Sequence, residues 1–194
     1  RHTRKLLQHY EIETPLTPLH QHNEHARVAG LIQELAAQDS TLAVVSDAGT
    51  PGISDPGYLI VQAALKQGVA VEVLPGAVAF VPALVASGLP CERFVFEGFL
   101  PPKKGRQTRL QTLAQEPRTF ILYEGPHRIA KTLGQLAAWC GADRPATAAR
   151  ELTKLHEEVR RGTLAELQQH FEAQPARGEF VLIVAGTGAS ARNA

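Results

Sequence analysis

We expect the chain to be organised around one stretch, Thr41-Leu-Ala-Val-Val-Ser-Asp-Ala-Gly-Thr-Pro-Gly-Ile-Ser-Asp-Pro-Gly57. It opens with a short apolar run at residues 42–45, of the length and β-branched content expected of a buried strand, and a turn of small residues follows. Asp55 and Pro56 are typical of an N-cap and a first helical position, which predicts that a helix begins there. Gly68 is expected to end that helix, and residues 69–74 have the pattern of a second buried strand. The stretch therefore predicts a βαβ unit, in which ligands bind outside the carboxyl ends of the strands.

Helices and strands alternate along the rest of the chain, which predicts an α/β fold with a mainly parallel sheet in the first half. A strand is expected at residues 16–19, and Asn23 is expected to cap an amphipathic helix. The segment Gly88-Leu-Pro-Cys91 is the best candidate for a boundary, giving domains at residues 1–89 and 90–194. Further strands are expected at 94–97, 119–123, 145–150 and 180–184, with an extended segment at 156–161. Further helices are expected at 1–10, 77–87, 104–115, 126–140 and 163–171, the last opened by a capping box.

Composition is that of an ordinary globular protein, with 44% hydrophobic and 20% charged residues. No apolar run approaches the roughly 18 residues that a membrane span needs, and no secretory signal pattern opens the sequence. Cys91 and Cys140 lack metal or disulfide spacing, which favours two isolated thiols in a reducing compartment. We therefore expect a cytoplasmic protein. Residues 1–90 contain 5 Lys/Arg and 8 Asp/Glu, whereas residues 91–194 contain 15 and 11, so the second half suits an anionic partner.

The turn at residues 46–52 is a candidate ligand site. Its glycines let the backbone approach a ligand closely, and Asp47 could hold a hydroxyl or an amine. The turn matches neither the G-x-x-x-x-G-K-[ST] nor the G-x-G-x-x-G nucleotide pattern. An ordinary turn between strand and helix is the alternative.

Four basic residues lie close together at the start of a predicted helix, namely Lys103, Lys104, Arg106 and Arg109. Positive charges at this spacing could bind the phosphates of a nucleic acid without reading its sequence. A solvated loop is the alternative, since runs of like charge usually face water.

Two further stretches combine a strand end with ionisable side chains. In Tyr123-Glu-Gly-Pro-His-Arg128, Glu124 or His127 could serve as a general base, and the helix start favours anions. Arg150-Glu-Leu-Thr-Lys154 leaves another strand with charges of both signs. Solvated turns and ion pairing are the alternatives, and the residue types alone do not decide between them. The stretch His20-Gln-His22-Asn-Glu-His25 fits no zinc-ligand spacing, so no metal site is predicted.

Several motifs in a fixed order carry a resemblance to a known family. They are Val45-Ser-Asp-Ala-Gly-Thr-Pro-Gly-Ile-Ser-Asp-Pro-Gly57, Val73-Leu-Pro-Gly-Ala77, Ser87-Gly-Leu89, Phe96-Glu-Gly-Phe-Leu-Pro101, Tyr123-Glu-Gly-Pro-His-Arg128, Arg150-Glu-Leu-Thr-Lys154 and Gly178-Glu-Phe-Val181. In this order they closely resemble the ribosomal RNA (cytidine-2'-O)-methyltransferases of the tetrapyrrole methylase superfamily. The resemblance runs from Arg1 to about Gly186.

The resemblance implies an S-adenosylmethionine-dependent enzyme that methylates the ribose 2'-hydroxyl of a cytidine in the 16S RNA of the small ribosomal subunit. It implies two α/β domains, a mixed sheet in the second domain, a cofactor cleft between the domains, and a homodimer. Members of the family begin with a strand and a glycine loop that are absent before Arg1, and we expect that absence to weaken cofactor binding. The residues implied to bind the cofactor are Asp47, Ala48, Gly49, Thr50, Pro51, Pro75, Gly76, Ala77, Tyr123 and Arg150. Those implied to face RNA are Lys103, Lys104, Arg106, Arg109, Arg128 and Lys154.

Methyl transfer to a 2'-hydroxyl needs an aligned oxygen and a group that takes its proton. Our candidates for that base are Glu124 and His127, with Arg128 or Lys154 holding the adjacent phosphate. One alternative is a methyltransferase that acts on a corrin or porphyrin precursor in the same cleft. Another is a non-catalytic RNA-binding module. Cofactor binding separates the module from both enzymes, and dependence on RNA separates the two enzymes from each other.

Overall fold

The chain divides into two compact units. The computed structural model describes residues 2–20, 23–38, 40–175 and 177–188. The units are Arg1–Val78 and Ala79–Ala194. The sequence placed the boundary later, at residues 88–91. The helix that precedes those residues belongs to the second unit because its apolar side chains pack against the sheet of that unit.

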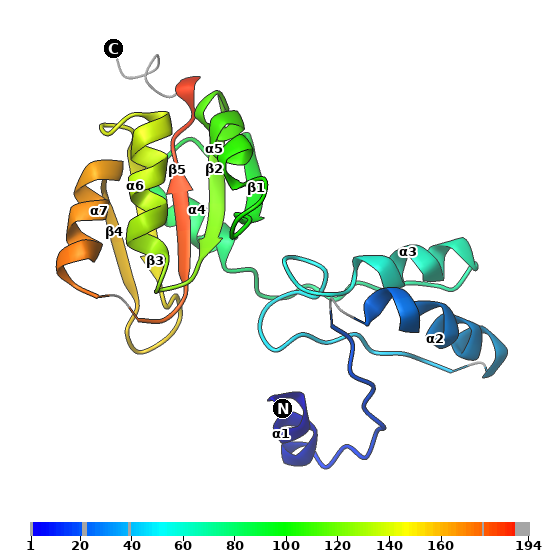
Figure 1. Ribbon diagram of the computed structural model, residues 1–194. Coiled ribbons are helices and arrows are strands. Elements are labelled where there is room, and N and C mark those ends of the chain that lie inside the picture. Colours follow the sequence, from blue (N-terminus) through cyan, green and yellow to red (C-terminus); the bar gives the residue numbers. More distant parts are fainter. Residues whose placement is uncertain (1, 21–22, 39, 176, 189–194) are drawn as a thin grey trace. The chain divides into compact units, whose positions relative to one another are not determined.

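The first unit contains three helices, which are α1 (His2–His9), α2 (Glu24–Gln38) and α3 (Tyr58–Lys66). Helices α2 and α3 lie side by side (Figure 1) and bury one small apolar core between them. The fully buried members of that core are Val28, Ile32, Ile60 and Ala64. The apolar stripe predicted for the helix after Asn23 is therefore the face that meets α3.

The strands predicted for the first unit are not formed. Residues 16–19, 42–45 and 69–74 do not pair, and no described residue of this unit takes part in a sheet. Apolar side chains that a sheet would bury are exposed, Val73 and Leu74 among them. A strand needs a neighbour whose backbone exchanges hydrogen bonds with it, and an apolar composition alone does not supply one. The mainly parallel sheet predicted for the first half is thus not found in the described residues.

The second unit is built on a mixed five-stranded sheet, as the resemblance implied. Its strands are β1 (Phe94–Phe99), β2 (Thr119–Glu124), β3 (Pro145–Arg150), β4 (Glu158–Thr163) and β5 (Phe180–Val184). Their order is β1-β2-β5-β3-β4, with β1 parallel to β2 and every other pair antiparallel. Because β2 and β3 both run against β5, the strands β1, β2 and β3 point the same way. Their carboxyl ends therefore meet at one edge of the sheet.

Helices cover both faces of this sheet. They are α4 (Phe80–Ser87), α5 (Arg106–Ala114), α6 (Ile129–Cys140) and α7 (Leu164–Ala173). Helices α5, α6 and α7 share one face (Figure 1), where the larger core contains Leu110, Leu133, Leu136 and Leu167. Helix α4 packs on the opposite face. The central strand β5 is buried along its whole length because both faces are covered.

The capping box that opens α7 offers a test of the local structure. The N–H of Glu166 donates to the Thr163 hydroxyl at 3.2 Å, and the N–H of Thr163 donates to the Glu166 carboxylate at 2.8 Å. We expect Thr163→Ala to lower the free energy of unfolding by about 1 kcal/mol in urea denaturation. Thr112→Ala is the control, since among the described residues that hydroxyl bonds to the Thr108 carbonyl within its own helix, α5, and we expect it to cost less than about 0.5 kcal/mol. Equal losses in the two variants would contradict the role of the cap.

Candidate functional site

The predicted site residues of the second unit gather at the carboxyl ends of β1, β2 and β3. In the sheet register, Glu124 and Arg150 both lie opposite Phe180 of β5, and Tyr123 lies opposite Val181. The row of residues that contains Glu124 and Arg150 faces the helices α5, α6 and α7, whereas Tyr123 faces α4. Residues far apart in the sequence are thus brought to one edge of the sheet.

Glu124 is a buried carboxylate whose two oxygens are both bonded. Its exposed fraction is 2%, although it is the last residue of β2. One oxygen accepts the N–H of Gly125 at 2.8 Å and pairs with Nη2 of Arg128 at 2.8 Å. The other accepts the hydroxyl of Thr132 at 2.7 Å. A carboxylate held in this way anchors the groups around it.

Arg106 lies near the other oxygen of the same carboxylate. Its Nη2 donates to the Thr132 hydroxyl at 2.7 Å and lies 4.0 Å from Glu124. The other guanidinium nitrogens donate to Gln135 at 2.8 Å and to the carbonyl of Pro101 at 3.2 Å. Burial lowers the pKa of Arg106, and the charge of Glu124 opposes that shift. This buried network ties the loop before α5 to the start of α6.

The predicted RNA-facing residues therefore divide into two kinds. Lys103 and Lys104 are exposed on the loop before α5. Arg106 is 8% exposed, so its side chain supports that loop from inside. Arg109 is paired with Glu97 of β1, and this hydrogen bond raises the pKa of Arg109. Among the described residues, Lys103 and Lys104 have no carboxylate partner, whereas Arg109 is exposed but has one.

Sequence analysis missed Thr132 and Gln135 as parts of the site. A signal was present, because Arg128, Thr132 and Gln135 follow the i, i+4, i+7 spacing that places residues on one face of a helix. Polar side chains along one stripe of an otherwise apolar helix indicate a buried polar contact. His127, by contrast, is exposed, and its imidazole makes no hydrogen bond or ion pair with another described residue.

The loop between β3 and β4 is strained and held by charge. Glu151 and Thr153 have backbone φ of 48° and 67°, in a region that residues other than glycine rarely adopt. The Glu151 carboxylate accepts Nζ of Lys154 at 2.9 Å and the N–H of Glu179 at 3.0 Å. The hydrogen bond from Lys154 lowers the pKa of Glu151. Lys154 also pairs with Glu179 at 3.1 Å, so this cluster joins the ends of two strands.

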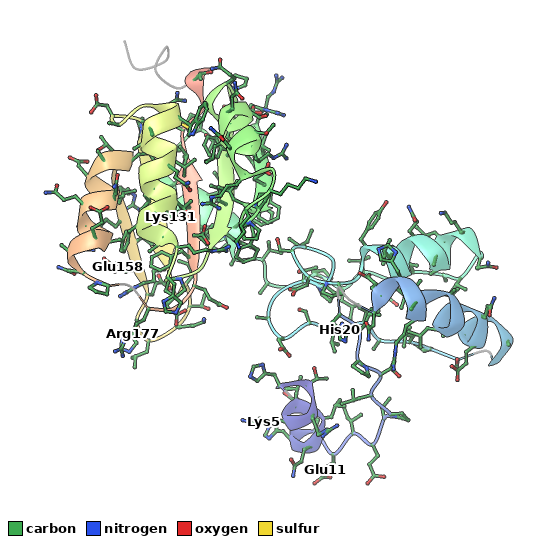
Figure 2. The ribbon with its side chains drawn as sticks, in the orientation of Figure 1. Lys5, Glu11, His20, Lys131, Glu158 and Arg177 are labelled. Atoms are coloured by element: carbon green, nitrogen blue, oxygen red, sulfur yellow. The ribbon has the colours of Figure 1, made fainter. Side chains whose placement is uncertain are left out.

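Arg150 forms an ion pair through one nitrogen and has a second, buried nitrogen without a hydrogen-bond partner among the described residues. Its Nη2 lies 3.2 Å from Glu158 of β4, which Figure 2 labels at this end of the sheet. Its Nε is buried and has no hydrogen-bond partner among the described residues. A buried donor without a partner is costly, and it marks a place where a ligand oxygen would accept a hydrogen bond from this N–H.

In the first unit, the two predicted cofactor loops lie against each other. The hydroxyl of Thr50 donates to the carbonyl of Ala77 at 3.1 Å. A side chain at Gly49 would lie 3.5 Å from that same carbonyl, and Gly49 has φ of 77°. Asp47, Ala48, Pro75 and Gly76 are exposed around this contact, and Pro51 is half-buried. Small residues thus leave backbone groups of both loops accessible, as a ligand cradle requires.

Glu24 anchors the same region and was not singled out by the sequence. Its side chain is buried, and one carboxylate oxygen accepts the N–H of Gly57 at 3.0 Å. Gly57 has φ of 146°, and a side chain there would lie 2.8 Å from the nitrogen of Gly52. The predicted helix accordingly begins at Tyr58 rather than at Asp55.

Neither metal clusters nor membrane spans are found in the part of the chain that the structure describes. No three His, Cys, Asp or Glu side chains gather there as a metal site would require. His22, in the histidine-rich stretch, lies outside the described residues. None of the described helices has both the length and the apolar character needed to cross a bilayer.

Comparison with known proteins first defines the class. A family model described as Tetrapyrrole (Corrin/Porphyrin) Methylases matches residues 1–168. Among solved structures, diphthine synthase aligns with a TM-score of 0.69 at 16% identity, covering 94% of this chain and 73% of its own. Uroporphyrin-III C-methyl transferase from Thermus thermophilus, complexed with S-adenyl homocysteine, aligns with a TM-score of 0.54 at 19% identity, covering 87% and 75%. At such identities these structures establish the fold alone.

Curated relatives then define the family. Ribosomal RNA small subunit methyltransferase I of Synechocystis sp. is 51% identical over 187 residues, which are 96% of this chain and 67% of the relative. The protein of the same name from Xylella fastidiosa strain Temecula1 is 53% identical over 189 residues, 96% of this chain and 69% of the relative. The chain therefore belongs to the tetrapyrrole methylases and, within them, to the family of ribosomal RNA small subunit methyltransferase I.

The buried network makes a prediction about stability. Glu124→Gln keeps the side-chain shape but removes the charge that balances Arg106 and Arg128. We expect it to lower the free energy of unfolding by about 3 kcal/mol in urea denaturation, because two guanidinium groups lose their counter-charge. Glu116→Gln is the control, since Glu116 also pairs with an arginine, Arg118, but at the surface, and we expect a loss below about 1 kcal/mol. If Glu124→Gln lost as little stability as Glu116→Gln, Glu124 would not be the charge that stabilises Arg106 and Arg128.

The contacts of Glu151 in the loop between β3 and β4 give a second prediction about stability. Gly178 has φ of 86°, and a Cβ there would lie 2.4 Å from Cγ of Glu151. Gly178→Ala should therefore displace Glu151 and lower the unfolding free energy by about 1–3 kcal/mol more than backbone strain alone. Gly88→Ala isolates that strain, since Gly88 has φ of 73° with nothing within 4 Å of its Cβ position. Equal urea midpoints for the two variants would argue against the contact.

Proposed function

We propose that this chain is an S-adenosylmethionine-dependent methyltransferase that methylates the ribose 2'-hydroxyl of a cytidine in the 16S RNA of the small ribosomal subunit. The observation that carries the proposal is the identity of about half of all residues to ribosomal RNA small subunit methyltransferase I, over 96% of this chain. The motifs that carry the resemblance include the residues gathered at the sheet edge. The curated relatives reported above do not favour a corrin or porphyrin substrate, nor a non-catalytic module.

The residues present fit the cofactor. The loops that contain Asp47, Ala48, Gly49, Thr50 and Pro51, and Pro75, Gly76 and Ala77, adjoin through small side chains, which leaves backbone donors and acceptors for its polar groups. In the second unit, Tyr123 and the open Nε donor of Arg150 stand at the strand ends where ligands bind in α/β sheets. When bound, S-adenosylmethionine supplies an electrophilic methyl group on a positively charged sulfur.

The charged groups at the sheet edge suit an RNA backbone. Lys103 and Lys104 project from a loop that the buried Arg106 supports, and Arg128 is held in place by Glu124. Phosphate contacts of this kind position RNA without reading its sequence. We assign Arg106 the support of that loop, and Lys103, Lys104, Arg109, Arg128 and Lys154 the phosphate contacts.

The proton of the 2'-hydroxyl needs an acceptor. His127 is exposed at the turn between β2 and α6. Of the two candidate bases, it is the one whose side chain is not bonded to another described residue. Glu124 is engaged on both oxygens, so we assign it to the positioning of Arg128. His127 then takes the proton while Arg128 holds the neighbouring phosphate. Alignment of the 2'-oxygen with the methyl group accounts for the remaining acceleration of the reaction.

Two broader assignments belong to the same proposal. A cytoplasmic location follows from a ribosomal substrate and from cysteines without disulfide spacing. A homodimer is the state that the family resemblance implies.

The experiment measures transfer of labelled methyl groups to small ribosomal subunits that lack this modification. We expect transfer by the wild-type chain, and a single-turnover rate lower by about 10²–10⁴-fold for His127→Ala. Cofactor affinity by calorimetry should be unchanged in that variant. Lys131→Ala, on the adjoining helix α6, is the control and should keep the wild-type rate. An unchanged rate for His127→Ala would exclude it as the base, whereas cofactor binding without any RNA methylation by the wild type would overturn the proposed function.

A further inference from the structure

A bulge in β1 redirects the side chains at the end of that strand. Phe96 lies opposite Ile121 of β2, but the next paired residue is Gly98, opposite Leu122. Glu97 and Gly98 thus share one partner residue, and Gly98 has φ of 70°. An extra residue of this kind changes the face on which the following side chain lies.

Because of the bulge, Glu97 and Phe99 lie on opposite faces of the sheet although they are two residues apart. Glu97 points toward α5, where it pairs with Arg109. Without the extra residue, Phe99 would share that face. With it, Phe99 lies beside Tyr123 on the α4 face, with ring centroids 5.6 Å apart and ring planes at 61°.

Phe99 stands on a rigid aromatic support and is open to solvent. Phe80 of α4 stacks on Phe96 at 4.5 Å, and Phe96 contacts Tyr123 edge-on at 5.1 Å. These rings belong to the apolar cluster under α4, which fixes Tyr123 in place. Phe99 itself is 53% exposed. A large aromatic ring that packs against another ring on one side and is exposed on the other is a surface for stacking.

The charge around this ring indicates what it stacks on. The chain after Phe99 runs directly into the loop of Lys103 and Lys104, and the turn of Arg128 follows Tyr123. Proteins hold single-stranded nucleic acid by combining exposed aromatic rings with cations that contact the backbone, and this part of the chain supplies both within a few residues. A docked apolar protein surface would have to cover these cations, which carries a desolvation cost.

We propose that Phe99, backed by Tyr123, is a stacking platform for an unstacked base of the substrate RNA. This inference rests on the proposed function, because it names how the same site holds its RNA. Stacking recognises the flat face that every base has, so the platform holds a base in position while the phosphate contacts set the path of the strand.

The test compares binding of two fluorescein-labelled oligomers of about 12 nucleotides, one a cytidine RNA and the other an abasic strand with the same ribose–phosphate backbone. Fluorescence anisotropy should show that Phe99→Ala binds the RNA about 5- to 100-fold more weakly, with unchanged affinity for the abasic strand. Phe99→Trp should retain RNA binding. Phe94→Ala is the matched control, since Phe94 lies on the same face at the other end of β1 and is 38% exposed, and it should leave both affinities unchanged.

Each other outcome overturns the platform. Unchanged RNA affinity in Phe99→Ala would remove the ring from the binding surface. Equal weakening toward both oligomers would show that the ring supports the loop instead of a base. A fall in calorimetric affinity for S-adenosylmethionine in Phe99→Ala would assign the ring to the cofactor. Methylation of ribosomal subunits by the wild type shows whether the proposed function itself holds, independently of these results.

Discussion

The architecture of the site depends on one buried negative charge. A carboxylate removed from water is stable only when cations and hydrogen-bond donors surround it. Glu124 therefore requires Arg128 and Thr132 from the turn and helix that follow it, and Arg106 from the first position of α5, earlier in the chain. Arg106 is itself buried and has no other counter-charge within the network. Each charge thus makes the other tolerable, and the loop before α5 is held to the start of α6.

Two local departures from regular structure complete the same edge. The bulge at Gly98 allows Glu97 and Phe99 to serve opposite faces of one strand. The positive φ of Glu151 persists because its carboxylate is bonded to Lys154 and to the backbone of Glu179. Strain of this kind survives only where surrounding contacts determine the conformation, and it concentrates at functional sites. The central part of the sheet, by comparison, is regular.

The sequence predicted the second unit far better than the first. The predicted bounds of the strands at 145–150 and 180–184 are the observed bounds of β3 and β5, because the sheet buries both segments. Residues 42–45 and 69–74 are also largely apolar but form no strand, because no neighbour pairs with them in the described residues. Among the site residues, neither the burial of Arg106 nor that of Glu124 was foreseen. A charged residue type favours the surface on average, and only its partners decide whether it can be buried.

The sequence by itself determined the local features and the family of this protein. The capping box at Thr163, the left-handed glycine that ends α4 and the ordered motifs all depend on residues close together in the chain. The tertiary structure alone decided which charges are buried and which aromatic ring is exposed. Burial depends on segments that meet only when the sheet forms, as β2, α5 and α6 do around Glu124. For the same reason Phe99, an apolar residue in an apolar strand, faces solvent, whereas Arg106 in a basic segment does not.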